Sequence, residues 1–420
     1  MNRDTNGAQG PLAGCRVLEL GSTVAAPFCG RLFADLGAEV VNVERPEGDS
    51  LRSLGRHYEG KSLWWASIHR NKETIAINLQ SDSGRDVVRR LIPHFDIVIE
   101  NFKPGTLEKW GLGYEDVAKD HPGLILVRIS GFGQSGPYSG RAGYGIIGES
   151  LSGIRSITGE PDRPPSRVAT PMTDYVAGMY GAFGAAAALH ERTRTGRGQI
   201  VDVALYEAAF SMMESFIPAF DKLGLVPNRV GSRLHGHVPN SLFPVKEEEW
   251  IHIAAGNTST FRRLAAAMGQ PELADDPRFA ESPERLENEE ELVAVISRWT
   301  ETWTLGDLYK YLVEKDIPAG PIYTVADVFT DPQFAAREMI VDVPDEEIGS
   351  LKLSGIAPKF SRTPGALRWT GQSIGHDTRT VLARDLGLSD AELDTLEAER
   401  AIASAPAGHA STSPPADGSA

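Results

Sequence analysis

The chain has 420 residues, more than one cooperative core usually needs, so its length predicts two domains or one large domain with an excursion. With 41% hydrophobic and 24% charged residues, it has the composition of a globular protein. The 42 Lys and Arg residues against 57 Asp and Glu give a formal charge of -15. Such a surface would repel a polyanion, so nucleic acid is not an expected partner.

The sequence shows no sign of export or membrane insertion. The N-terminal segment lacks the apolar core of a signal peptide, and no run of about 18 apolar residues occurs. Cys15 and Cys29 are the only cysteines, so neither a disulfide framework nor a four-cysteine zinc site is expected. These features predict a cytoplasmic protein.

Short apolar runs alternate with helical segments along the first part of the chain. CRVLELG begins at Cys15, an amphipathic stretch runs from Pro27 to Leu36, and AEVVNVE follows Gly37. Proline near a helix start and glycine past its end are helix signals, so the pattern predicts strand, helix, strand with a parallel pairing. The alternation continues through ETIAINL, DIVIEN and LILVRIS, which predicts an α/β fold with a doubly wound, Rossmann-like sheet.

Residues 172–191 form an Ala- and Gly-rich segment that predicts a helix with one face of small side chains. Asp174, Gly178, Gly181 and Ala185 recur at spacings of four, three and four, so they share one side of this helix. We expect that side to lie very close to another part of the backbone.

Changes in composition predict the domain limits. The large α/β domain is expected to begin with residues 1–222 and to be followed by a linker rich in Gly, Pro, Asn and His at 223–249. Residues 250–316 are expected to form a smaller α+β domain, and 317–402 to return to the large domain. The Ala/Ser/Pro/Gly-rich segment 403–420 has the composition of a disordered tail.

Several familiar motifs are absent or incomplete. The G-x-G-x-x-G run at 131–136 follows a strand, but Pro137 and further glycines continue a loop where a dinucleotide site needs a helix. His235 and His237 have no clear third partner and favour loop histidines over a metal site, so no metal is expected. The acidic stretch 281–291 is typical of a solvated helix face.

Asp174 stands at the start of the small-residue helix. There the helix dipole and free backbone N–H groups stabilise an ionised carboxylate. The local sequence alone favours a simple helix cap over a functional group.

Six blocks of sequence, in order, carry a family resemblance that favours a functional role for Asp174. They are PLAGCRVLELGSTVAAPFCGRLFADLGAEVVNVERPEGD at 11–49, ENFKPGTLEKWGL at 100–112, ISGFGQSGPYSGRAGY at 129–144, PMTDYVAG at 171–178, TGRGQIVDVALYEA at 195–208 and IPAGPIYTVADVFTDPQ at 317–333. Together they resemble the class III CoA-transferase family, whose relatives include formyl-CoA transferase, carnitine CoA-transferase and α-methylacyl-CoA racemases. The likeness extends from residue 11 to about 395.

The resemblance implies an architecture and a set of site residues. It implies a large α/β domain formed by both ends of the chain, an inserted smaller domain, and an interlocked homodimer. Asp174 matches the nucleophile of the transferases, and a lysine that grips the CoA phosphates in some members is replaced by Gln80. The positions that match CoA contacts are Val24, Ala25, Ala26, Arg45, Asn101, Phe102, Lys109 and Tyr144.

The implied activity is transfer of CoA from an acyl-CoA, with succinyl-CoA preferred, to a carboxylic acid through an aspartyl-CoA thioester. Coenzyme A thioester is then a substrate, and no permanently bound cofactor is expected. The alternatives are an acyl-CoA racemase or epimerase of the same fold and a catalytically silent CoA-binding protein. Racemisation is disfavoured because Tyr144 and Thr258 occupy its histidine and glutamate positions, and phenol and hydroxyl groups are poor bases near neutral pH.

Overall fold

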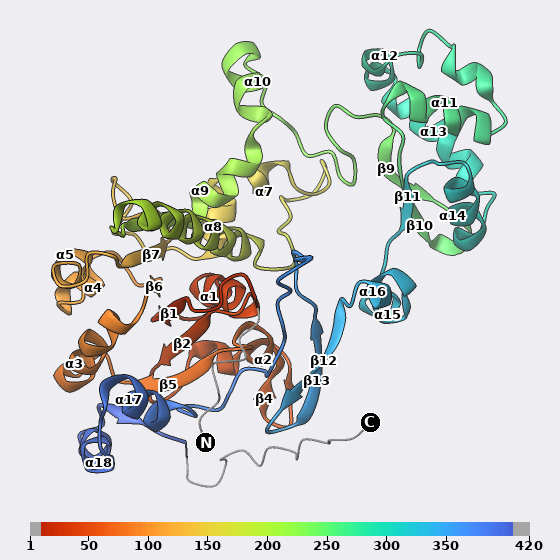
Figure 1. The fold of residues 1–420 in the computed structure, drawn as a ribbon. Coiled ribbons are helices and arrows are strands. Elements are labelled where there is room, and N and C mark those ends of the chain that lie inside the picture. Colours follow the sequence, from red (N-terminus) through yellow and green to blue (C-terminus); the bar gives the residue numbers. More distant parts are fainter. Residues whose placement is uncertain (1–9, 406–420) are drawn as a thin grey trace. The chain divides into compact units, whose positions relative to one another are not determined.

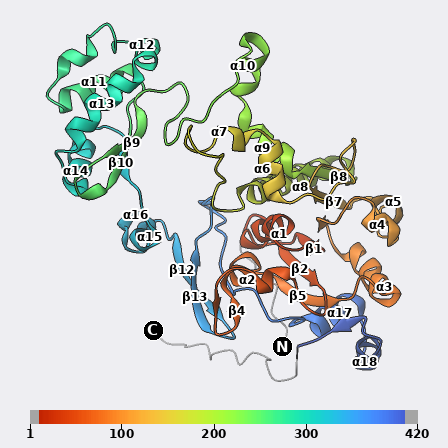
Figure 2. The ribbon, with the colours of Figure 1, turned by 180° about the vertical axis from the view of Figure 1, so that it is seen from behind.

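The computed structural model describes residues 10–405, which divide into two compact units (Figures 1 and 2). Within the described residues, the first unit comprises 10–154, 168–219 and 335–405, and the second comprises 155–167 and 220–334. Separate clusters of buried apolar side chains lie in the two units. Each unit therefore has a hydrophobic core of its own.

Among residues 10–405, a seven-stranded sheet forms the centre of the first unit. In spatial order its strands are β14 (Ile402–Ala403), β5 (Glu73–Ile77), β2 (Glu39–Glu44), β1 (Arg16–Glu19), β6 (Ile97–Glu100), β7 (Ile125–Ser130) and β8 (Ile200–Ala204). All neighbours pair in parallel except β14, which is antiparallel to β5. The predicted parallel α/β sheet is confirmed. Its strand order reverses between β1 and β6, the position where such sheets bind ligands.

Alternate side chains of the strands enter two different cores, so the sheet is covered on both faces. Leu18 and Val41 face a core shared with α3 (Asp82–Leu91), α17 (Thr378–Leu386) and α18 (Asp390–Ala398). Val17 and Val40 face α1 (Ala25–Asp35) and α8 (Met172–Thr195) on the other side. Figure 1 shows these two groups of helices on opposite sides of the sheet.

The predicted helix signals match the ends of α1, whereas α8 ends later than expected. Helix α1 has Pro27 in its first turn and ends before Gly37, whose φ is +96°. Helix α8 continues past the expected limit near Glu191 because its stop residue is Gly196, with a φ of +69°. A left-handed residue past the last turn is where glycine avoids a steric cost.

The other described elements of the first unit are short. The helices are α2 (Leu63–Ile68), α4 (Thr106–Lys109), α5 (Tyr114–Val117), α6 (Gly145–Leu151) and α9 (Leu205–Phe210), with 3-10 turns η2 (Ser50–Ser53), η3 (Ile92–His94) and η4 (Ser211–Met213). The hairpins pair β3 (His57–Tyr58) with β4 (Lys61–Ser62) and β12 (Ile340–Asp345) with β13 (Gly349–Ser354). The G-x-G-x-x-G run forms turns after β7 and, as predicted, opens no helix.

The second unit combines a small antiparallel sheet with helices. Its strands, in the order β11-β10-β9, are β11 (Ala319–Pro321), β10 (Trp250–Ala254) and β9 (Asn240–Pro244). Its helical segments are α11 (Thr258–Ala267), η5 (Lys246–Glu248), η6 (Pro271–Ala274), α12 (Ser282–Glu287), α13 (Glu289–Thr300), α14 (Leu305–Glu314) and α15 (Val325–Thr330). Three helices cross the limits between the units: α7 (Ile154–Ile157), α10 (Phe216–Leu223) and α16 (Pro332–Ala336).

These limits differ from those expected from composition. Strand β9 lies within the expected linker 223–249, and β11 lies beyond the expected end of the small domain at 316. Ala403 belongs to β14 although the tail was expected to be disordered from 403, and residues 406–420 of that tail lie outside the described residues. Strand β9 pairs with the neighbouring β10, whereas β11 and β14 are short strands whose partners are distant in sequence. The local composition of such short strands carries little signal.

Candidate active site

Asp174 is the third residue of α8 and the only acidic residue of its first turn. The N-cap position is occupied by Pro171, not by Asp174. The carboxylate is half-buried and lies at the positive end of a 24-residue helix. This position favours its ionised form, as a nucleophile requires.

The Asp174 carboxylate lies directly against the backbone of Gly145, the first residue of α6. A methyl group on Gly145 would overlap one carboxylate oxygen and would lie 2.7 Å from the Asp174 Cγ atom. Figure 2 shows α6 beside α8 and α9. Helix α6 is held there by a second glycine, because a methyl group on Gly148 would lie 3.1 Å from the backbone nitrogen of Tyr206. Two glycines thus let α6 approach the carboxylate.

The predicted small-residue face of α8 packs against the start of α1. A methyl group on Gly178 would lie 2.8 Å from the carbonyl oxygen of Ala25, and one on Gly181 would lie 3.2 Å from the Cys29 sulfur. Gly178 follows Asp174 by about one helical turn on the same side, so the close approach places the first turn of α1 near the carboxylate. The expected close packing of this face is confirmed.

Three of the predicted CoA contacts, Val24, Ala25 and Ala26, form this end of α1. Their side chains are buried, so only their backbone groups are available to a ligand. Val24 packs in a cluster that includes Tyr175, the neighbour of Asp174. The structure therefore brings these three positions and Asp174 to one region of the first unit.

Asn101 holds the loop between β1 and α1. Its Oδ1 accepts the backbone N–H of Ser22 at 2.9 Å, and its Nδ2 donates to the Ser22 carbonyl at 2.8 Å. From the other side, the Asp49 carboxylate accepts the N–H of Thr23 at 3.2 Å. Thr23 has a φ of +70°, an uncommon conformation for a β-branched residue. Asn101 thus positions the loop at the strand reversal through both ends of its amide.

The remaining predicted contacts lie at the edges of this region. Phe102 is half-buried and packs edge-on against Trp110, with ring centroids 5.2 Å apart. Arg45 directly follows β2, Lys109 ends α4, and neither cation has an ion-pair partner among residues 10–405. Tyr144 immediately precedes Gly145, and its side chain is 73% exposed. The structure places Tyr144 beside the Asp174 region but shows no contact that joins Arg45, Lys109 and Phe102 within the described chain.

A buried ion pair beneath α1 was not predicted from the sequence. The Nζ of Lys72 donates to both carboxylate oxygens of Glu19 at 2.8 Å and to the carbonyl of Pro27 at 2.7 Å. Burial raises the pKa of Glu19 to about 7 and lowers the pKa of Lys72. A charged residue inside the apolar run RVLEL was the available signal, but its partner is distant in sequence.

A second buried network lies beside the loop that Asp49 holds. Arg52 donates to both oxygens of Glu44 at 2.8 Å, and its guanidinium lies 3.6 Å from the centre of the Trp65 ring. Glu44 in turn accepts the backbone N–H of Asp49 at 2.9 Å. This chain of contacts fixes Asp49 and, through it, the N–H of Thr23.

The second unit contains a further unpredicted residue and the second racemase position. Arg285, within the stretch expected to be a solvated acidic face, is fully buried and donates to the carbonyls of Val238, Phe279 and Gly256. Thr258, at the glutamate position of the racemases, donates its hydroxyl to Glu281 at 3.3 Å.

Residues 10–405 contain neither a candidate metal cluster nor a candidate membrane-spanning helix. No group of three His, Cys, Asp or Glu side chains there could hold a metal ion. None of the helices in that range has the length and apolar character that a membrane crossing needs.

Comparison with known proteins agrees with the geometry. The model of CoA-transferase family III matches residues 12–378. The chain is 47% identical over 394 residues to succinyl-CoA–D-citramalate CoA-transferase of Chloroflexus aurantiacus, covering 93% of this chain and 98% of that protein. It is 36% identical over 397 residues to succinate–glutarate CoA-transferase of Agrobacterium fabrum, covering 92% and 96%.

A solved structure shares the fold. The crystal structure of a CAIB/BAIF family protein from Brucella suis superposes with a TM-score of 0.80 at 36% identity, covering 90% of this chain and 100% of that one. Sequence and fold therefore agree over nearly the whole chain. The chain belongs to CoA-transferase family III and is an enzyme that transfers CoA between an acyl-CoA and a carboxylic acid.

Proposed function

We propose that this enzyme moves CoA from succinyl-CoA to a small dicarboxylic acid, with Asp174 as the covalent nucleophile. The donor is supported by the names of relatives, which include succinyl-CoA transferases for D-citramalate and for L-malate. The observation that carries the mechanism is the position of the Asp174 carboxylate, half-buried at the start of α8 and against bare backbone at Gly145.

The reaction divides one difficult exchange into four acyl transfers. A carboxylate oxygen of Asp174 attacks the thioester carbonyl of the donor, the C–S bond breaks, and CoA thiolate leaves behind a mixed anhydride. The thiolate attacks the Asp174 carbonyl and expels succinate, which gives an aspartyl-CoA thioester. The acceptor carboxylate then attacks this thioester, and the released thiolate attacks the acceptor carbonyl of the new anhydride. The product acyl-CoA forms and the Asp174 carboxylate is restored.

The local packing fits a nucleophile that must not reach bulk water. Both intermediates hydrolyse readily, so the site has to be dry and rigid. Gly145 lets the start of α6 pack against Asp174, Gly148 lets α6 pack against the start of α9, and Gly178 lets α8 pack against the start of α1. The carboxylate needs no proton removed before it attacks, which agrees with the absence of a histidine at the position of Tyr144.

We also infer that the enzyme acts as a homodimer whose subunits interlock. Large apolar side chains are exposed on α8 and from the last residue of α9 through α10, and none of the eight residues of α10 is buried. Monomers rarely expose such a set without a partner. The exposed side chains are Met179, Tyr180, Phe183, Phe210, Met212, Ile217, Phe220 and Leu223.

Trapping the intermediate tests the mechanism. Wild-type enzyme incubated with succinyl-CoA alone and then with hydroxylamine should carry a hydroxamate at Asp174, seen by peptide mass spectrometry. Asp174→Asn keeps the shape but lacks the nucleophile, so kcat should fall by roughly 10³-fold or more while CoA affinity and melting temperature stay unchanged. Near-normal transfer by Asp174→Asn, or exchange of the substrate α-proton with deuterated water at the turnover rate, would refute the proposal.

A further inference from the structure

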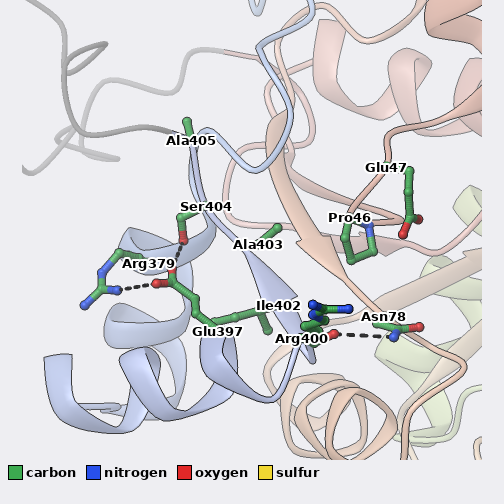
Figure 3. Close-up of a pocket in the computed structure, with 10 residues that line it drawn as sticks. All are labelled: Pro46, Glu47, Asn78, Arg379, Glu397, Arg400, Ile402, Ala403, Ser404 and Ala405. Carbon is green, nitrogen blue, oxygen red and sulfur yellow. Dashed lines mark hydrogen bonds and ion pairs between the residues drawn. The ribbon is translucent and has the colours of Figure 1, made fainter.

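A cavity of about 860 Å³ lies at the edge of the first unit where β2 and β5 end (Figure 3). Pro46 and Glu47 follow β2, and Asn78 follows β5, so these three residues leave the carboxyl ends of parallel strands. The opposite wall comes from the C-terminal segment, with Arg400, Ile402 and Ser404. Two segments more than 300 residues apart in sequence therefore form one cavity.

Among the residues that line this cavity, Arg400 is the cation whose charge is not paired with an anion. No hydrogen bond or ion pair to its guanidinium is found within residues 10–405. The other arginine of the cavity, Arg379, is already paired with Asp390, Asp394 and Glu397 at 2.9–3.1 Å. An anion that entered the cavity would thus meet one unpaired guanidinium.

Two hydrogen bonds fix the position of the Arg400 backbone. Its φ is +58°, its N–H donates to the Glu397 carbonyl at 2.9 Å, and its carbonyl accepts the Asn78 amide at 3.3 Å. A left-handed position just past a helix favours glycine, and other residues there are strained by about 1 kcal/mol or more. The turn after α18 therefore places Arg400, which is exposed, at the wall of the cavity beside Asn78.

The cavity lies along the same edge of the sheet as the proposed CoA region. Strand β5 is two positions from β1 in the sheet, so their carboxyl ends are roughly 10 Å apart. Arg45, a position that matches a CoA contact, directly precedes Pro46 of the cavity wall. CoA is a long molecule with its thiol at one end and a 3′-phosphoadenosine at the other. If the thiol lies near Asp174, the phosphorylated end can extend past β2 toward β5.

We propose that Arg400 binds the 3′-phosphate of CoA in this cavity. The inference rests on the proposed function, because it takes the acyl-CoA to lie with its thioester near Asp174. A guanidinium forms paired, charge-assisted hydrogen bonds with a phosphate. The exposed Glu47 on the same cavity adds a negative charge that would oppose this phosphate. Arg400 should therefore attract the 3′-phosphate, and Glu47 should repel it.

Calorimetry with CoA and with 3′-dephospho-CoA, on the full chain, tests the proposal. Arg400→Gln should weaken CoA binding by about 10-fold and leave dephospho-CoA binding unchanged. Glu47→Gln should strengthen CoA binding by a few fold and again leave dephospho-CoA unchanged. Arg90→Gln is the matched control, because Arg90 is exposed in the last turn of α3 and does not line the cavity.

The outcomes separate this inference from the proposed function. Equal effects of Arg400→Gln on CoA and dephospho-CoA, or no effect on either, would overturn the assignment of Arg400 while hydroxamate formation at Asp174 still supported the transferase mechanism. Failure of the wild-type enzyme to bind CoA at all would overturn both. If Arg400→Gln folds poorly, the direction of the Glu47→Gln effect decides the question by itself.

Discussion

Replacing Gly145 by alanine should displace the Asp174 carboxylate without changing its chemical identity, so this variant tests the position of the carboxylate alone. Gly145 does not have a left-handed φ, and alanine is favoured over glycine in a helix by about 1 kcal/mol, so the backbone tolerates the change. The methyl group would nevertheless overlap the Asp174 carboxylate and lie 2.7 Å from its Cγ atom. Ordinary contacts begin near 3.4 Å and the nearer carboxylate oxygen lies closer to the methyl group than Cγ does, so this oxygen must move by roughly 1.5 Å.

A displacement of this size at a nucleophile should lower kcat by about 100-fold. The assay is steady-state transfer from succinyl-CoA, with CoA affinity measured separately and expected to stay within about two-fold. Gly140→Ala is the matched control, because its methyl group would meet no atom within 4 Å and its φ is not left-handed. Equal turnover of the two variants would mean that the attacking group is not the Asp174 carboxylate in this position.

Three further predictions concern assembly and buried groups. Light scattering from nanomolar to micromolar concentration should show no stable folded monomer, and a folded monomer would contradict the interlocked dimer. The raised pKa of Glu19, about 7 against an ordinary 4.5, means that its stabilising contribution is complete below about pH 4.5 and is lost as the pH rises through 7. The unfolding free energy of wild type minus that of Glu19→Gln should therefore fall between about pH 5 and pH 8 in urea titrations, and a rise would refute the burial argument. Burial and the charge of Asp96 raise the pKa of Cys15 to about 12, and burial also raises that of Cys29, so iodoacetamide at mild pH should label neither until the protein unfolds.

The sheet and the small-residue face could be predicted because their signals are local. Runs such as AEVVNVE give a buried strand directly, and Gly37 and Gly196 mark helix ends through their own backbone conformation. The spacing of Gly178 and Gly181 shows that one face of α8 can approach a neighbour closely. It does not show which neighbour, so α1 emerged only from the structure.

Features that depend on distant partners could not be predicted. Strand β14 has two residues and exists because the edge of β5 offers unpaired backbone groups. Lys72 precedes a strand, and its local sequence is typical of a surface lysine. Only the fold shows that it pairs with Glu19. Asn101 was expected to contact CoA, yet the structure shows its amide holding Ser22. Residue type and spacing thus indicated a candidate site, whereas the contacts that each side chain makes depended on the tertiary structure.

The buried charges beneath α1 connect the stability of the fold with the geometry of the site. Lys72 donates to the Pro27 carbonyl in the first turn of α1 as well as to Glu19. The same turn carries Ala25, whose carbonyl lies against Gly178 one helical turn from Asp174. Breaking a buried ion pair by removing one partner typically destabilises a protein by 3–5 kcal/mol, because the other charge remains buried. Since rigid support of reacting groups is what lets a preorganised site act, removing Lys72 or Glu19 should disturb both the fold and the turn of α1 that packs against α8 near Asp174.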